Sequence, residues 1–301
     1  RVTRSDAPGH DRQESTALSI LATWEGSDAY TLKAQVTTER SNLEYGFDWD
    51  WSDFDTVGVR GFENNVRDRR ANSIDLRFLS KPGSEILGGA SWVAGIYAYE
   101  REVNLSYRED ADYYGAWTDG LISSFDSSRY AAYGQLDWML SEQWLLSLGS
   151  RFEHFENDYF DSFGVVGELE DDLIGGKLSL QYLVSDDVMI YGAVSQGYKT
   201  GGLNTDAFGK ALVSGDAATI ALLNEQLTYE DEAALNYELG LKGSYLDASL
   251  AVNLTAFYID RQNMHAKLAL EITTGNWTSY RANVDGSNNY GIELETDWQI
   301  T

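Results

Sequence analysis

The chain has 301 residues, with 48 acidic and 22 basic side chains, a net charge of −26, no cysteine and 43% hydrophobic residues. This apolar content excludes a disordered chain, and the lack of cysteine excludes disulfide scaffolds, thiolate zinc sites and cysteine nucleophiles. A polyanion of this strength repels phosphate backbones, so no nucleic-acid partner is expected.

Composition and hydropathy predict a strand-rich fold. Only 2 prolines accompany 28 glycines and 19 tyrosines, and no apolar run approaches the ~18 residues of a membrane helix. Apolar and polar residues alternate with the period of two that is typical of strands, for example from Trp144 to Phe152. The segments with this pattern predict about eleven strands, many of them longer than the usual ~5–6 residues. They are 14–25, 29–40, 69–80, 85–108, 127–140, 143–156, 175–185, 187–199, 233–245, 247–260 and 282–301.

The expected connections alternate between short and long. Short turns contain Pro82-Gly83 or Ser185-Asp186-Asp187, and an up-and-down meander with its long loops at one end predicts the alternation better than a Greek-key sandwich. Residues 211–223 have near-helical spacing and are expected to form a short helix. The expected long polar loops are 41–68, 109–126, 157–174, 200–232 and 261–281.

Together these features predict an all-β fold, an antiparallel up-and-down meander that forms part of a transmembrane outer-membrane β-barrel. A soluble barrel with so many long strands would have a lumen too wide for side chains to fill. The apolar side chains of each strand are therefore expected to face lipid and the polar ones to face the lumen. The expected luminal residues are Arg151, Glu153, Lys177, Gln181, Glu238, Lys242, Glu293 and Glu295.

The odd number of strands predicts that residues 1–301 are one part of a larger barrel. The first and last expected strands both run toward the short turns, whereas bacterial single-chain barrels have even strand numbers. Neither a globular plug domain nor a closing strand with a terminal aromatic residue is recognised in the sequence. We therefore expect further strands to complete the barrel.

Several segments in the second half of the chain resemble TonB-dependent outer-membrane receptors of the iron-complex group. They are YGAVSQGYKTGGLN (191–204), LTYEDEAALNYELGLKGSYLD (227–247), ASLAVNLTAFYIDRQNM (248–264) and NVDGSNNYGIELETDW (283–298). The resemblance implies a receptor for an iron chelate (a siderophore) or a similar nutrient, imported with energy from the TonB complex. It implies no enzymatic activity and no cofactor, and outer-membrane lipid and lipopolysaccharide as further partners.

Two other functions remain open at this point. A passive porin would need neither a bound ligand nor a plug. An outer-membrane hydrolase would need a nucleophile, and Ser195 is a near miss of the G-x-S-x-G elbow, because Ala193 replaces the first glycine and the segment continues as strand. The net charge of −26 argues against an anionic ligand unless that charge is neutralised locally.

Five residues are candidates for ligand contacts. Tyr198 and Lys199 stand at the outer end of a strand, where aromatic and basic side chains can meet a ligand. Trp49 and Trp51 form an aromatic group in the loop after the second strand. His265 follows the family-like strand at a position where such strands commonly continue with glutamines.

An acidic group in that same early loop is the candidate cation site. An EF-hand would need glycine at its sixth position and glutamate at its twelfth, and the residues there are Asp53 and Val59, so only a looser site is possible. The histidines His10, His154 and His265 are scattered, and no His/Glu spacing in the sequence indicates zinc or iron. The candidate ligands are Asp48, Asp50, Asp53 and Asp55.

Overall fold

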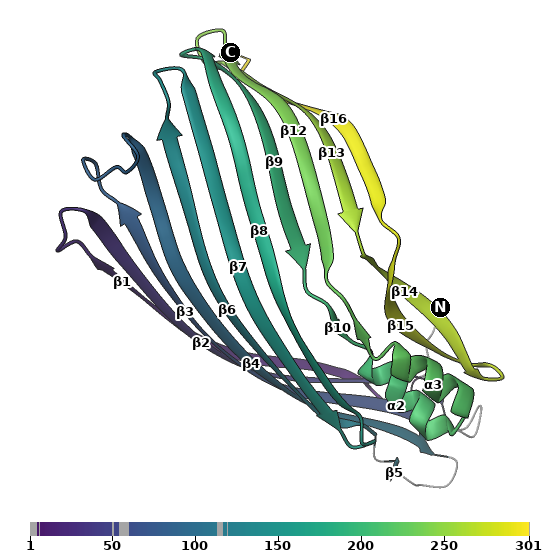
Figure 1. The fold of residues 1–301 in the computed structure, drawn as a ribbon. Coiled ribbons are helices and arrows are strands. Elements are labelled where there is room, and N and C mark those ends of the chain that lie inside the picture. The colour runs from purple at the N-terminus through teal and green to yellow at the C-terminus, as the bar shows by residue number, and fades with distance from the viewer. Residues whose placement is uncertain are drawn as a thin grey trace.

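The computed structural model describes residues 5, 7–49, 51–53, 60–112, 117–118 and 120–300. Eleven long strands and the short β5 (Trp117–Thr118) form one curved antiparallel sheet (Figure 1). The long strands are β1 (His10–Trp24), β2 (Tyr30–Asp48), β3 (Arg60–Ser80), β4 (Ala90–Asp112), β6 (Ile122–Met139), β7 (Trp144–Asp161), β8 (Val166–Ser185), β9 (Val188–Lys199), β12 (Glu232–Tyr245), β13 (Leu250–Gln262) and β16 (Ser287–Trp298).

Each long strand pairs with the next long strand along the chain, so the sheet is an up-and-down meander. The predicted fold class is therefore confirmed, and each predicted strand corresponds to one of the long strands. Within the described part of the chain, β1 pairs only with β2 and β16 only with β13. The sheet is accordingly open, with one free edge at each end.

Several strands extend further than their apolar segments predict. Residues 157–174, expected as a long loop, are the ends of β7 and β8 joined by a tight turn at 162–165. That prediction was wrong because the backbone hydrogen bonds between the two strands continue past the apolar segment and do not depend on apolar side chains. Residues 261–281 likewise contain β14 (Met264–Thr273) and most of β15 (Asn276–Val284), which form a separate hairpin.

Two helices, α2 (Thr205–Ser214) and α3 (Ala217–Glu225), replace the single helix expected at 211–223. Gly215 ends α2 with a φ of 72°, in the left-handed region that glycine adopts without strain. Asp216 then caps α3 by accepting a hydrogen bond from the Thr219 backbone N–H at 2.8 Å. Hydrogen bonds from the side chain and backbone of Thr219 lower the pKa of Asp216.

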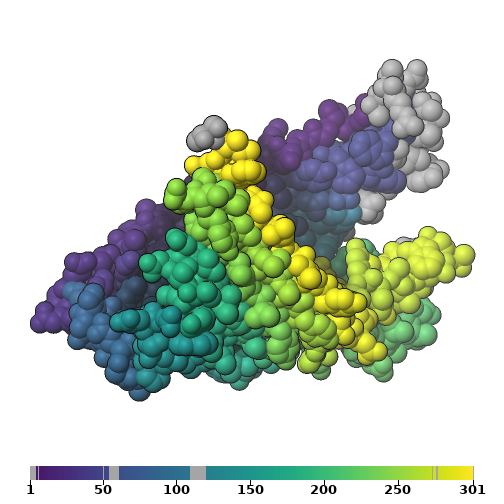
Figure 2. Space-filling view, turned by 90° about the horizontal axis from the view of Figure 1, so that it is seen from above, coloured from purple at the N-terminus to yellow at the C-terminus, as the bar shows by residue number. Residues whose placement is uncertain are grey.

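The helices and the β14–β15 hairpin pack together at one end of the sheet, opposite the short turns that join β1 to β2, β6 to β7 and β8 to β9 (Figure 1). Viewed from the tight-turn end, the yellow-green hairpin projects beside the main sheet (Figure 2). Asn204 joins the parts, since its amide donates to the carbonyls of Gln226 and Arg281 and accepts from the Arg281 N–H. The short strands β10 (Gly202–Leu203) and β11 (Thr228–Tyr229) flank the helices. Among the described helices, neither has the length and apolarity needed to span a bilayer.

One face of the sheet is an exposed apolar belt. Cross-strand registers place apolar or aromatic side chains side by side from β7 to β16, and each exposes at least 37% of its surface. Exposed aromatics Trp24 and Trp144 lie beside tight turns, as expected for an interfacial girdle. The central row of the belt is Leu148, Leu178, Val194, Tyr237, Tyr258 and Tyr290.

The opposite face is polar and concave. Side chains on this face contact one another across intervening strands. The Tyr133 hydroxyl on β6 donates to Asp75 on β3 at 2.7 Å, passing over β4. Tyr133 can lie flat there because its cross-strand neighbour is Gly95, where a Cβ atom would collide with the ring. The apolar residues thus face outward and the polar ones inward, as predicted for a barrel with a hydrophilic lumen.

Candidate functional site

The concave face contains a cavity of about 1010 Å³ that spans β3, β4, β6, β7 and β8. Aromatic rings form part of its wall, with Tyr97 and Tyr99 stacked at 6.5 Å between ring centroids. Its lining has three more positive than negative side chains. The charged members are Arg77, Arg101, Arg129, Arg151 and Lys177 against Asp75 and Glu153.

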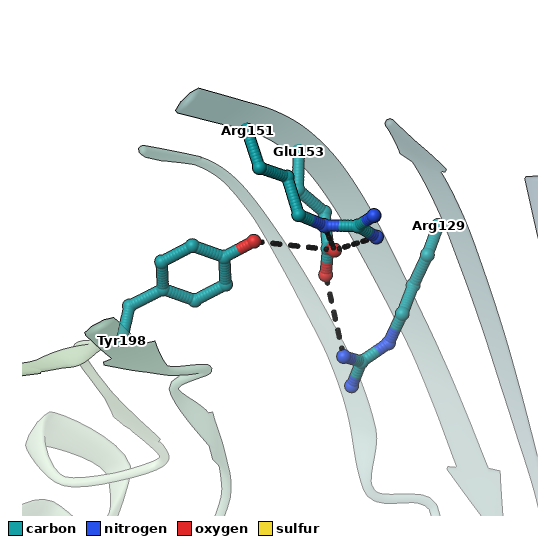
Figure 3. A network of polar contacts seen from close by, with 4 residues as sticks. All are labelled: Arg129, Arg151, Glu153 and Tyr198. Atoms are coloured by element: carbon teal, nitrogen blue, oxygen red, sulfur yellow. Dashed lines mark hydrogen bonds and ion pairs between the residues drawn. The ribbon is translucent and has the colours of Figure 1, made fainter. Parts of the chain in front are cut away.

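A buried carboxylate organises one side of the cavity (Figure 3). Glu153 has 4% of its surface exposed, and the Arg151 guanidinium donates two hydrogen bonds to its Oε2, at 2.6 and 3.0 Å. Arg129 approaches Glu153 Oε1 at 3.4 Å, and the Tyr198 hydroxyl donates to Oε2 at 3.3 Å. A buried charge needs such partners, and two arginines around one carboxylate leave an excess of positive charge.

A second group fixes the guanidinium of Arg77. Its Nη2 lies 2.7 Å from Asp75, and its Nε donates to the Tyr133 hydroxyl at 3.1 Å. Arg151 also lies over the rings of Tyr97 and Tyr133, at 5.4 and 5.9 Å from their centroids. These cation–π contacts and hydrogen bonds hold the arginine heads in place, so the cavity is pre-organised for an anion.

Two further cations in the lining lack an acidic partner. Within the described part of the chain, neither Arg101 nor Lys177 lies within ion-pair distance of a carboxylate. Arg101 instead lies over the Phe125 ring at 5.6 Å, and its Nε is buried without a hydrogen-bond partner. Both groups are thus free to pair with a negatively charged ligand.

The cavity changes what the net charge implies for the ligand. A chain of charge −26 argues against anionic ligands, but here the concave face of the sheet supplies a local positive surface. Arginine forks match carboxylate and phosphate oxygens in two parallel hydrogen bonds. The geometry is therefore suited to an anionic compound with several oxygen donors.

Comparison with protein families places the whole chain in one group. The family model described as "TonB dependent receptor-like, beta-barrel" matches residues 1–301. The chain belongs to the TonB-dependent receptor β-barrel family. The predicted family is thus confirmed, and with it the location in the outer membrane.

Individual members of the TonB-dependent receptor family show how much of a receptor this chain represents. It is 29% identical over 178 residues to the pesticin receptor of Yersinia pestis, covering 56% of this chain and 23% of that receptor. The ferric yersiniabactin uptake receptor FyuA of Yersinia pestis superposes with a TM-score of 0.72 and 20% identity, over 97% of this chain and 41% of that one. The copper transporter OprC superposes with a TM-score of 0.70 and 15% identity, over 96% and 44%.

The structure does not bring the five predicted ligand contacts of this receptor chain together. Tyr198 points to Glu153 at the large cavity, and Lys199 lines a neighbouring cavity of about 420 Å³ with Arg261 and Glu232. These two come from the end of β9, as expected. Arg151 and Lys177 were expected to face the lumen, but their grouping with Arg77, Arg101 and Arg129 was missed, because each cation arises from a different strand and no local motif joins them.

The remaining candidates lie outside the main sheet, after the end of β2 and on the β14–β15 hairpin. The Trp49 ring covers Gly61, and Trp51, after the end of β2, is 65% exposed. His265 lies on β14, where its Nε2 is 2.7 Å from the carbonyl of Glu230 and its ring meets Tyr229 edge-on. Their roles in ligand binding stay predictions.

The predicted acidic cation site is only partly described. Asp50 and Asp55 lie outside the described residues. Asp48 is buried and accepts a hydrogen bond from the Trp51 N–H at 3.1 Å, which makes it the cap of a local turn. Asp53 lies within the described residues, and its side chain is not without a partner.

Proposed function

We propose that the protein is an outer-membrane receptor that binds an anionic metal chelate and imports it with energy from the TonB complex. The observation behind this proposal is the surplus of cationic side chains around the concave cavity of a chain whose net charge is −26. Neutral or cationic nutrients would gain nothing from that surface, whereas carboxylate or phenolate groups of a chelate would pair with it.

The relatives support metal-linked cargo without defining one compound. FyuA is named for ferric yersiniabactin uptake and OprC for copper transport. A chelate whose oxygen donors reach past the metal could meet Arg101 and Lys177 directly. Tyr198, Lys199, Trp49, Trp51 and His265 are proposed as further contacts on its path, at the ends of strands and in the outer connections.

We further propose that the sheet is one part of a larger closed barrel. The free edges of β1 and β16 leave backbone N–H and C=O groups that a membrane cannot solvate, so further strands have to pair with them. In the assembled barrel, the exposed apolar belt would contact lipid chains, and the polar strand ends beyond it would meet lipopolysaccharide.

Binding measurements on the purified receptor in detergent test the proposed ligand class. The informative double variant is Arg101→Gln with Lys177→Gln, since these cations have no carboxylate partner that the change would leave unpaired. Each charge-assisted hydrogen bond contributes about 1.5–3 kcal/mol, so the double variant should weaken binding of an anionic ferric chelate by at least about tenfold. The matched control is Lys33→Gln with Arg40→Gln, which removes the same charge outside the cavity; within the described residues neither side chain forms an ion pair.

Growth under iron limitation provides the corresponding uptake assay. The cavity variant should need more chelate than the control variant for equal growth, and the affinity for a neutral chelate should be unchanged. An equal loss of chelate affinity in both double variants would show a general charge effect and refute the assignment of the cavity as the chelate-binding site. Non-saturable passage of small solutes without TonB would indicate the porin alternative.

A further inference from the structure

A second group of polar side chains lies on the outward face of the β7–β8 pair, just beyond the apolar belt. On β7 the outward residues up to Phe152 are apolar except for Ser150, and the partner of Phe152 on β8 is Ile174. The next outward pairs toward the outer end are His154 with Asp172 and Glu156 with Glu170. Residues directly opposite in an antiparallel pair have Cβ atoms about 4.5–5.5 Å apart, so these four side chains are forced together.

The donor atoms of this group converge on one ring nitrogen. His154 Nε2 lies 3.3 Å from Glu156 Oε1 and 3.9 Å from Glu170 Oε1, and one donor atom from each residue falls within 4.8 Å of the other two. Two ligand atoms each ~2.1 Å from a tetrahedral metal ion lie roughly 3.4 Å apart. The observed spacing is close to that value, and the glutamates, 51% and 72% exposed, can adjust.

The other ring nitrogen of His154 is held by a carboxylate. Nδ1 lies 2.8 Å from Asp172 Oδ1, and an N–H donated there leaves the lone pair of Nε2 directed at the two glutamates. A carboxylate on the far nitrogen is the usual support of a metal-binding histidine, because it fixes the tautomer and the ring orientation. A purely structural ion pair would not require this third acid.

The group also lacks a balancing cation. Within the described part of the chain, no lysine or arginine forms an ion pair with Glu156, Glu170 or Asp172; their only ionic partner is His154. Like charges opposite each other on neighbouring strands destabilise a sheet. A divalent ion between Nε2 and the two glutamates would remove that repulsion.

We infer that His154, Glu156 and Glu170 bind one divalent transition-metal ion of the Zn²⁺ type on the outside of the sheet, with Asp172 as a positioning residue. One imidazole with two carboxylates is a nitrogen–oxygen set that favours such ions over Ca²⁺ and Mg²⁺, which prefer all-oxygen sites. The site is on the face opposite the concave cavity, so it is independent of the proposed chelate binding. It links β7 to β8 beyond the apolar belt.

Zn²⁺ titration of the chelator-washed receptor in detergent, followed by calorimetry, tests this inference. One Zn²⁺ equivalent should bind to the unaltered protein, and binding should be lost in Glu156→Gln with Glu170→Gln and in His154→Ala. Asp172→Asn should weaken binding by about 10–100-fold without abolishing it. The matched control is Asp158→Asn with Glu168→Gln, the next outward acidic pair on the same strands, which has no imidazole.

Each outcome decides the question, because all the substituted side chains are at least partly exposed and folding can be checked separately by circular dichroism. Co²⁺ in place of Zn²⁺ gives a second signal, a visible absorption band that should appear in the control variant and be absent in the ligand variants. Equal Zn²⁺ binding by the control and ligand variants would overturn the site. Equal or tighter binding of Mg²⁺ would overturn the assignment to transition metals.

Discussion

Replacing Leu148 by arginine tests whether the apolar face of the sheet meets lipid. Leu148 lies in the middle of the outward apolar stretch from Trp144 to Phe152 and is 50% exposed. At ~3.4 Å per residue this stretch is about 27 Å long. With a strand tilt of ~40°, it spans roughly 21 Å of membrane, close to the ~25 Å apolar band of such barrels.

This position determines the size of the effect. A lipid-facing arginine costs about 2–4 kcal/mol at the bilayer midplane and about 0–1 kcal/mol near the interfaces. Leu148→Arg should therefore lower the free energy of unfolding by about 2–4 kcal/mol. On an apolar face in contact with water, the same substitution would cost almost nothing.

Denaturant unfolding in phospholipid vesicles, followed by tryptophan fluorescence, measures this difference. Ser147→Arg is the matched control, since Ser147 is the adjacent inward residue and its hydroxyl donates to Asp137 at 2.6 Å. An arginine there stays beside a carboxylate on the polar face and should change stability by less than about 1 kcal/mol. Equal destabilisation by the two substitutions would refute the assignment of outward and inward faces.

Four further results are expected. Gly95→Val should displace the Tyr133 ring and weaken chelate binding, which a binding titration against the unaltered receptor would detect. Asn204→Ala removes three buried hydrogen bonds and should speed amide hydrogen exchange in α2 and α3, with exchange in β7 unchanged. Ala248→Gly, at a φ of 66°, should raise the free energy of unfolding by up to about 1 kcal/mol, because relief of the ~1–2 kcal/mol left-handed strain exceeds the ~0.4–1 kcal/mol entropy cost of glycine. The pKa of Asp216 is lower in the folded state, so its contribution to α3 is present above the unfolded pKa of ~3.9 and is lost as pH falls through the folded value. The protection factors of α3 amides, measured against their intrinsic exchange rates, should therefore fall in acid.

The long strands could be predicted because the two faces of a barrel sheet impose a simple rule on them. In a segment such as 144–152 most outward residues are apolar and most inward ones are not, with Leu145 and Ser150 as the exceptions, since one face must be apolar and the other polar. Beyond the apolar belt this constraint ends. The residues of 157–174 still pair as strands, but their sequence has no apolar–polar alternation from which the strands could be predicted. The boundary between strand and loop was therefore the weak part of the prediction.

The sites were harder to predict, because they arise from register. Arg151 and Glu153 were expected to point inward, but their assembly with Arg129 and Tyr198 depends on how neighbouring strands are aligned. Glu170 likewise comes close to His154 only because the β7–β8 register places Glu170 opposite Glu156, two residues along β7 from the histidine. Once the strand pairing is known, adding up charges along one face would reveal the basic cavity.

The three hydrogen bonds of Asn204 have a mechanical consequence. They fasten the helical pair to the β14–β15 hairpin, whose Leu270 and Tyr280 also pack on the helix core, so we expect these elements to move together as one body. Any swing of this body relative to the sheet has to be absorbed by rotations at its junctions with β9, β12, β13 and β16. A spin-label pair within it should keep a constant separation, while its distance to β7 changes whenever the outer end of the receptor opens or closes.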